Sequence, residues 1–253
     1  MNPRVNPLPT LLWLELRKHT GWLTVLGGIL ALSLVVVLRV RQEVAGRPFG
    51  DQGGLFALQF VLLFLAALAG FLLLLIALGR ASRAETWLLL SVPPGITHQL
   101  ARFIFGATAL LVFAGGLAGL LWWGSSAFGL EVGLIGMLGL ALYLVILGLP
   151  LLALALLGRT LTLAYGLSRL GWLSGIATAL GAFNLLGWLF ELSARTIYSF
   201  LPVWPLPALR LAGQDLLGEV PVSGLPSEPL LYGLVLTALL IGLAGRVWDE
   251  VEA

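Results

Sequence analysis

The sequence of 253 residues has no cysteine, one lysine (Lys18) and two histidines (His19 and His98). The lack of cysteine excludes disulfides, thiolate metal ligands and a cysteine nucleophile. Two histidines are too few for a histidine-rich metal centre, so no metal site is expected. Charged residues make up 10% of the chain, whereas a soluble domain has about 25%. The net charge of +2 does not indicate a nucleic-acid partner.

Hydrophobic residues make up 59% of the chain, and its mean hydropathy is +1.03. This leaves too little polar surface to cover a fold in water, which indicates a protein that folds in lipid. A helix needs about 20 apolar residues to cross the bilayer core. The sequence therefore predicts an all-α integral membrane protein with a single transmembrane domain over residues 1–253. Its six spans are predicted at about 21–38, 55–78, 103–123, 132–157, 170–190 and 230–247.

The residues before the first span are expected to remain in the mature protein, because charged residues precede the apolar run and no signal-peptide pattern is present. Residues 10–20 predict an amphipathic helix that lies along the membrane interface. Leu12 and Leu16 fall on its apolar side, whereas Glu15, Lys18 and His19 fall on its polar side.

The basic residues around the spans predict the orientation. With the N-terminus inside, nine of the 14 basic residues lie in inner segments and five in outer segments, where Arg39 and Arg41 oppose the trend. Cytoplasmic segments are enriched in Arg and Lys. Both termini are therefore expected in the cytoplasm.

The sequence also lacks the motifs of a motor or an enzyme. A phosphate-binding loop needs a lysine after a glycine-rich turn, and Lys18 follows no such turn. There is no zinc-protease motif and no serine elbow with a histidine as its base. We therefore expect no catalytic residue, no enzyme activity by the chain alone and no cofactor bound by it.

The predicted spans contain almost no ionisable side chain, which argues against proton-driven transport. Milder polar side chains are candidates to line a pathway, although helix packing is the alternative for each: Asn184, Thr178, Ser174 and Gln59. Glycines four residues apart, such as Gly115 and Gly119, predict close helix contacts.

A short helix is predicted between the second and third spans. Ser82 and Glu85 form a capping box that begins it, and Pro93 with Pro94 ends it. Its other notable side chains are Arg83, Thr86, Trp87, Leu88 and Leu90. This helix either rests on lipid headgroups or docks as a coupling helix on a cytoplasmic partner.

Two further features concern partners and the outer surface. Arg80 and Arg102 are either contacts to the partner or ordinary positive-inside anchors. Residues 191–229 are rich in proline and aromatic residues, and they predict short helices lying at the outer membrane surface.

Three segments carry a family resemblance. Residues 11–18 (LLWLELRK), 83–93 (RAETWLLLSVP) and 200–210 (FLPVWPLPALR) resemble the interfacial helix, the coupling segment and the outer helices of ABC-2-type transporter permeases, which have the type V exporter fold. A glycine usual in the family's coupling segment is absent here.

The resemblance implies a permease that couples ATP hydrolysis in a separate cytoplasmic ATP-binding cassette subunit to export of a substrate. ATP and Mg would be bound by that subunit, and the permease would pair with a second copy or a paralogue. The expected location is the plasma (inner) membrane of a prokaryote, as a multi-pass protein in contact with lipid. The alternatives are a complex that does mechanical or assembly work on an extracytoplasmic partner, and a membrane scaffold that transports nothing.

Overall fold

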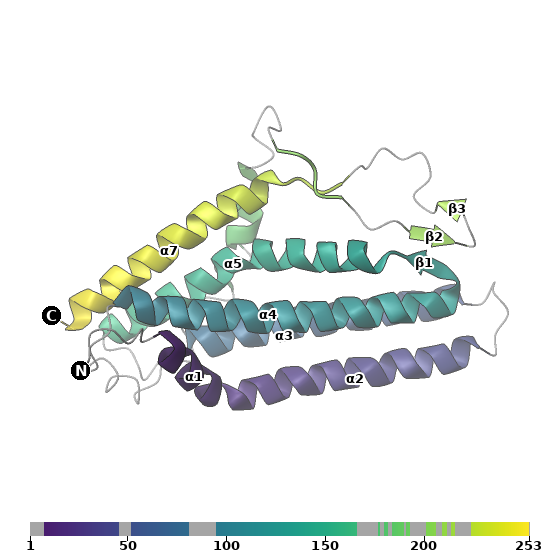
Figure 1. The fold of residues 1–253 in the computed structure, drawn as a ribbon, viewed down its shortest axis with the longest axis horizontal. Coiled ribbons are helices and arrows are strands. Elements are labelled where there is room, and N and C mark those ends of the chain that lie inside the picture. The colour runs from purple at the N-terminus through teal and green to yellow at the C-terminus, as the bar shows by residue number, and fades with distance from the viewer. Residues whose placement is uncertain are drawn as a thin grey trace.

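The computed structural model shows long helices packed side by side, with the first helix, from Leu8, and the last helix, to Glu252, meeting at one end, here called the termini end (Figure 1). The structure describes residues 8–45, 52–80, 95–165, 177, 180–181, 184–189, 191–192, 201–205, 209–211, 214–215 and 224–252. The helices are α1 (Leu8–Lys18), α2 (Thr20–Val44), α3 (Gly53–Gly79), α4 (Gly95–Ser125), the 3-10 turn η3 (Ser126–Phe128), α5 (Leu134–Ala164) and α7 (Glu228–Glu252).

Five of the described helices are long and apolar enough to cross a membrane, which confirms a multi-pass membrane protein. They are Thr20–Val44, Gly53–Gly79, Gly95–Phe128, Leu134–Ala164 and Glu228–Glu250. Each contains or largely overlaps one predicted span and extends beyond it, because the helical hydrogen bonds continue after the apolar run ends. The remaining predicted span, 170–190, falls largely outside the described residues, so six spans stay a prediction.

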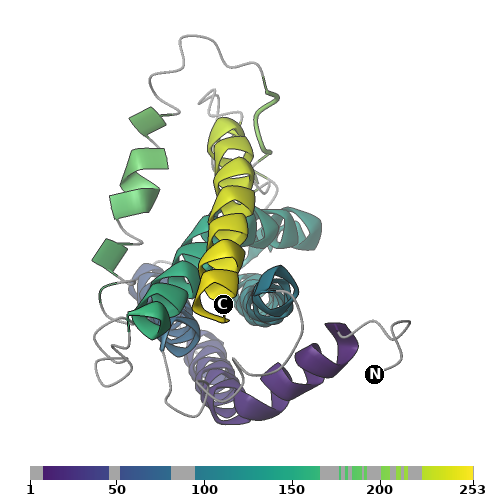
Figure 2. The same cartoon turned by 90° about the vertical axis from the view of Figure 1, so that its left-hand side faces the viewer.

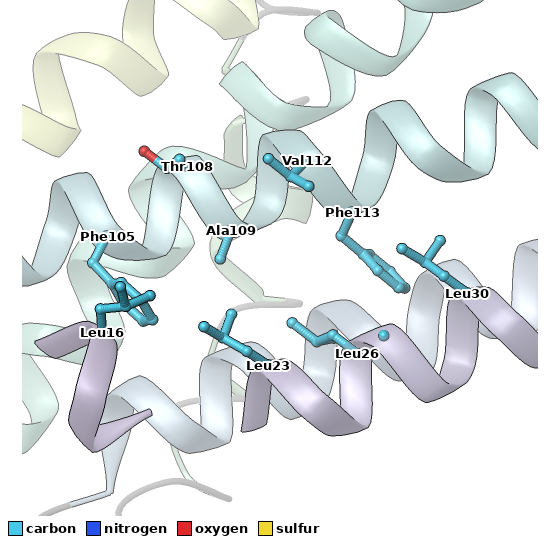
Figure 3. Close-up of a pocket in the computed structure, with 10 residues that line it drawn as sticks. Leu16, Leu23, Leu26, Leu30, Phe105, Thr108, Ala109, Val112 and Phe113 are labelled. Atoms are coloured by element: carbon cyan, nitrogen blue, oxygen red, sulfur yellow. The ribbon is translucent and has the colours of Figure 1, made fainter. Parts of the chain in front are cut away.

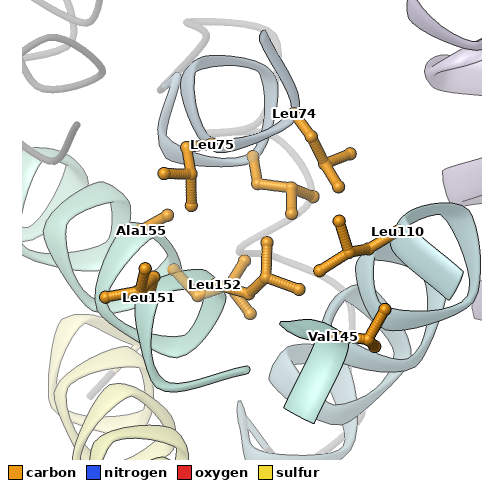
Figure 4. Close-up of a cluster of buried hydrophobic side chains, with 9 residues drawn as sticks. Leu74, Leu75, Leu110, Val145, Leu151, Leu152 and Ala155 are labelled. Carbon is orange, nitrogen blue, oxygen red and sulfur yellow. The ribbon is translucent and has the colours of Figure 1, made fainter. Parts of the chain in front are cut away.

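Helix α5 lies at the centre of the bundle, between α3, α4 and α7. Its side chains Leu151, Leu152 and Ala155 meet Leu75 of α3 and Leu110 of α4 in the main apolar cluster (Figure 4). Without water to expel, such contacts stabilise a membrane bundle through close packing. The side chains exposed on α2, α3 and α7 are mostly large and apolar, as expected of surfaces that face lipid.

The closest helix contacts occur at glycines, but not at those the sequence spacing singles out. A Cβ on Gly70 would lie 2.2 Å from Phe113, and a Cβ on Gly106 would lie 2.6 Å from Leu78. Gly115 and Gly119 have no atom within 4 Å of that position. Within the part of the chain that the structure describes, the predicted close contact at Gly115 and Gly119 is therefore not formed.

Helices α5 and α7 lie side by side and run in the same direction. Tyr143 of α5 packs near Leu230 at the start of α7, and Leu163 packs against Trp248 near the end of α7. Seen from the termini end, α4 lies beside the last turns of α7, and α1 lies at the edge of the bundle (Figure 2). This end therefore brings α1, α4, α5 and α7 together.

The opposite end of the bundle carries a small antiparallel sheet. Strand β1 (Leu130–Val132) pairs with β2 (Leu209–Leu211), which pairs with β3 (Gln214–Asp215). Trp204 also pairs with Leu225 as an isolated bridge. Between residues 201 and 226 the described residues are thus extended, so the prediction of short outer helices is wrong there. The prolines explain the difference, because each lacks an N–H donor and biases the preceding residue toward extended backbone.

Arg41 joins α2 to α4 at this same end. Its Nη1 donates to the carbonyl oxygen of Trp123 at 2.6 Å and to Ser126 Oγ at 2.9 Å, and its guanidinium lies 4.5 Å from the ring centre of Trp123. The last carbonyls of a helix have no partner within the helix, and a cation there stabilises them. The position of Arg41 is therefore explained by capping of α4.

Candidate functional site

A buried ion pair connects α1 to α4 at the termini end. Arg102 of α4 is fully buried, and its Nε donates to Glu15 Oε1 of α1 at 2.7 Å. Glu15 is only 3% exposed. Its other oxygen, Oε2, lies 3.3 Å from Nε2 of His19, one helical turn later. The polar face of α1 is thus turned into the protein.

Helices α5 and α7 complete the surroundings of this ion pair. The Arg102 guanidinium lies 5.3 Å from the centre of the Trp248 ring, which is itself met edge-on by the ring of His98 at 4.9 Å. Arg159 of α5 is fully buried and within electrostatic reach of both Glu15 and Arg102. The name basic cluster is used below for Glu15, His19, His98, Arg102 and Arg159.

The basic cluster has one carboxylate facing two buried guanidinium groups. Nη1 and Nη2 of Arg102 have no hydrogen-bond partner among the described residues, although the face of the Trp248 ring attracts the cation. Removing charges from water costs several kcal/mol per ion, and only good pairing compensates for it. Glu15 is therefore the side chain on which the stability of the buried Arg102 depends most.

The electrostatic effect of the cluster is visible in the pKa values of α1. Burial alone would raise the pKa of Glu15, but the hydrogen bond with His19 and the charge of Arg102 hold it well below its usual range. Lys18 retains an exposed surface. The partial burial of its amine, which removes solvating water, and the charges of Arg159 and Arg102 nevertheless lower its pKa to about 6. The charges of Arg159 and Arg102 therefore reach the α1 side chains Glu15 and Lys18.

These shifts predict how the ion pair responds to acid. A lowered carboxylate pKa stabilises the fold above the unfolded-state value of about 4.3, and that contribution is lost as pH falls toward the folded value. The difference in unfolding free energy between wild type and Glu15→Gln is therefore expected to stay constant from about pH 8 to about pH 5 and to shrink only below about pH 4. Equilibrium unfolding in detergent micelles at several pH values measures it. A difference that already halves between pH 7 and pH 5 contradicts the assignment.

A second joint at the termini end connects the beginning of α4 to the last turns of α7. The backbone N–H of Gly95 donates to Asp249 Oδ1 at 2.7 Å, so an acid from another helix caps α4. A Cβ on Gly95 would lie 2.6 Å from the carbonyl oxygen of Gly245 and 2.9 Å from Trp248 Cβ. Only glycine permits this approach.

Comparison of the chain with protein-family models, curated proteins and solved structures finds no match. Among the described residues, no three His, Asp or Glu side chains are placed to hold one metal ion. The two joints hold the first turns of α4 between α1 and α7.

Some of the predicted site residues lie outside the described residues, and the described ones differ in their exposure. Residues 82–93, which form the predicted coupling helix, lie outside the described residues, as do Ser174 and Thr178. Arg80 is exposed at the end of α3, which leaves it open to a partner. Arg102 is instead enclosed and bonded to Glu15, which removes it from any outer surface.

The two remaining pathway candidates have different surroundings. Gln59 is fully buried between α3 and α4, and a Cβ on Gly124 would lie 2.0 Å from its amide nitrogen. Asn184 is exposed, and its amide donates to the carbonyl of Leu180 at 3.1 Å. Gln59 thus lies inside a helix contact, and Asn184 bonds within its own segment.

Sequence reasoning missed the basic cluster as a unit. It assigned Glu15 and His19 to the polar face of an interfacial helix, and it gave Arg159 no role in a site. The available signal was the spacing of Glu15 and His19, four residues apart on one helical face. Nothing in the sequence indicated that Arg102 and Trp248 would meet that face.

Proposed function

We propose that the chain is the membrane-spanning permease subunit of an ATP-driven ABC exporter. It would couple ATP hydrolysis in a separate cytoplasmic nucleotide-binding subunit to export of a substrate. One observation carries this proposal: the first turns of α4, which follow directly on residues 82–93, are joined to α1 by Glu15 and Arg102 and to α7 by Gly95 and Asp249. A push on that segment therefore moves three helices together.

The parallel arrangement of α5 and α7 supports six spans. Both helices end at the termini end, since Leu163 and Trp248 pack together there. The chain must return to the opposite side between residues 165 and 228 before α7 begins. Residues 184–189 are helical and fall in this interval, which agrees with a span at about 170–190.

The distribution of cations supports placing both termini in the cytoplasm, in the plasma (inner) membrane of a prokaryote. Among the described residues, the larger share of arginines lies at the termini end, where cytoplasmic loops would be. Arg41 opposes the trend, but its bonds to Trp123 and Ser126 account for its place on the other side.

The partner side of the proposal rests on the family resemblance. ATP and Mg would be bound by the cassette subunit, and a second copy or paralogue would complete the transmembrane part. Within this chain, Ser82, Glu85 and Trp87 would receive the force, and Arg80 would contact the partner. Arg102 is assigned an internal role as the α4 end of the Glu15 ion pair.

Purification in mild detergent tests this proposal. We expect a P-loop ATPase subunit to co-purify, and its activity in the complex to fall several-fold when Glu85→Ala and Trp87→Ala are combined, because a coupling helix has lost its docking side chains. Trp122→Ala, an exposed tryptophan at the opposite end of the membrane, is the matched control. Vesicle transport measures export by the same complexes.

Each other outcome has a defined meaning. Coupled ATPase activity without solute movement, together with capture of an outer-face protein, indicates mechanical or assembly work. Absence of any nucleotide-binding subunit indicates a scaffold and contradicts the proposal. Full transport by the complex with residues 82–93 scrambled contradicts the coupling role.

A further inference from the structure

An apolar groove of about 300 Å³ lies where α1 and α2 pack against α4. Leu16 of α1 and Leu23 of α2 face Phe105 and Phe113 of α4 across it (Figure 3). Its volume is at the lower end of the range for ligand sites. The groove opens sideways to lipid, because Gly27 and Val112 on its walls are exposed.

The groove begins at the bend between α1 and α2. Thr20 Oγ1 donates to the carbonyl oxygens of Leu16 and Arg17, a bonding pattern that bends helices. The bend turns α1 away from the line of α2 (Figure 1). Leu16 of α1 lines one end of the groove, and Leu30, nearly three turns after the start of α2, lines the other.

The mouth of the groove has the chemistry of a membrane interface. Trp13, Leu16, Arg17 and Thr20 share one face of the helix by their spacing, and all four are exposed. The Arg17 guanidinium lies 5.6 Å from the ring centre of Trp13. Tryptophan and arginine together are typical of the headgroup level of a bilayer.

The charge at this end favours an anion. On α1, α2 and α4 the carboxylates are Glu15, which is sealed against Arg102, and Glu43, which lies at the far end of α2. Burial lowers the pKa of Lys18 most, and the positive charges of Arg159 and Arg102 behind the same helix lower it further. An anion at Arg17 therefore meets attraction without a competing acid on these three helices.

We propose that this groove binds one acyl chain of an anionic phospholipid from the leaflet at the termini end, with its headgroup phosphate on Arg17 beside Trp13. The apolar lining takes the chain and the exposed guanidinium takes the phosphate. A free phosphate would leave the groove empty. A zwitterionic lipid such as phosphatidylcholine, whose phosphate is offset by a choline cation, would bring no net negative charge to Arg17. The site does not depend on the proposed transport function.

Two adjacent glycines allow a matched test. Gly27 lines the groove and Gly28 does not, yet neither has an atom within 4 Å of a Cβ position. Purified full-length protein is incubated with phosphatidylglycerol, phosphatidylcholine or inorganic phosphate. Native mass spectrometry counts retained lipid, and thermal unfolding reports stabilisation.

We expect wild type to retain phosphatidylglycerol preferentially and to be stabilised by it. Gly27→Leu should lower its affinity about tenfold by filling the groove, while Gly28→Leu leaves it unchanged. Arg17→Gln should lower it roughly fivefold, and Arg39→Gln, an exposed arginine at the other end of α2, should not. Ala109→Leu fills the groove from α4 and replaces Gly27→Leu if that variant does not fold.

Three results overturn the proposal. Equal retention of phosphatidylglycerol and phosphatidylcholine excludes selection of an anionic headgroup. Unchanged retention in both Gly27→Leu and Ala109→Leu excludes the groove. Stabilisation by inorganic phosphate equal to that by the lipid excludes an acyl-chain ligand.

Discussion

Replacing Glu15 with glutamine is expected to destabilise the protein by about 3–5 kcal/mol, the usual cost of removing one partner from a buried ion pair. The substitution keeps the size of the side chain but leaves the fully buried Arg102 with no carboxylate at its Nε. It also increases the repulsion between Arg102 and Arg159, since Glu15 is the acid that both cations share. Equilibrium unfolding in detergent micelles, followed by circular dichroism, measures the change.

The control for this prediction lies on the same helix. Arg17→Gln also removes one charge from α1, but Arg17 is exposed, and surface substitutions change stability by about 0.5 kcal/mol or less. A similarly small change in unfolding free energy for Glu15→Gln would mean that the ion pair contributes little to the stability of the protein.

A second substitution isolates the interaction energy between Glu15 and Arg102 from the contributions of their other neighbours. Adding Arg102→Met to Glu15→Gln removes the unpaired cation and replaces it with an apolar chain of similar length, which restores most of the lost stability. The double-mutant cycle then gives an interaction energy of at least about 1 kcal/mol. Simple additivity of the two substitutions would show that Glu15 and Arg102 do not stabilise each other.

The membrane spans could be predicted from sequence because the signal is local. A long run of apolar residues is expected to be helical in lipid, since a helix satisfies all backbone groups within the segment itself. The ends of the spans are less predictable. Helix α4 begins at Gly95, eight residues before the predicted span at 103, because Asp249 from a distant part of the chain caps it.

Helix α1 shows which part of the site was beyond sequence reasoning. Its amphipathic pattern was correctly recognised, and its two faces were correctly divided. The sequence does not tell which medium each face meets, however. In the structure Glu15 and His19 face protein, whereas Trp13 and Leu16 are about half exposed on the lipid side. The difference depends on Arg102 and Arg159, which come from two other helices.

The glycines also show that contacts between helices cannot be read from one segment of sequence alone. Spacing identifies small residues that are able to allow a close contact, but the contact itself needs a neighbour. Gly70 has Phe113 against it and Gly95 has Gly245, while Gly115 has nothing. Which glycine matters is therefore a property of the packed bundle.

Replacing Gly95 with alanine is the second substitution with a large expected effect on stability. It should destabilise the protein, whereas the same change at Gly115, a matched position on α4, should stabilise it. Alanine at Gly95 would place its Cβ 2.6 Å from the Gly245 carbonyl oxygen, a backbone atom that cannot rotate away. Forcing such contacts costs about 1–3 kcal/mol, and α4 and α7 must separate to relieve them. Gly115→Ala on the same helix has open space around it and should stabilise by up to about 1 kcal/mol through helix propensity.

The joint at Gly95 also connects stability with coupling. If α4 passes force from residues 82–93 to α7, separating the two helices should uncouple the complex. Gly95→Ala should then retain ATPase activity in the partner subunit but lose most substrate export, whereas Gly115→Ala retains both. Unfolding in micelles and export into vesicles, measured on the same preparations, distinguish the two effects. Wild-type stability and export in Gly95→Ala would mean that α4 and α7 are not tightly joined, and the force would have to pass through α1 alone.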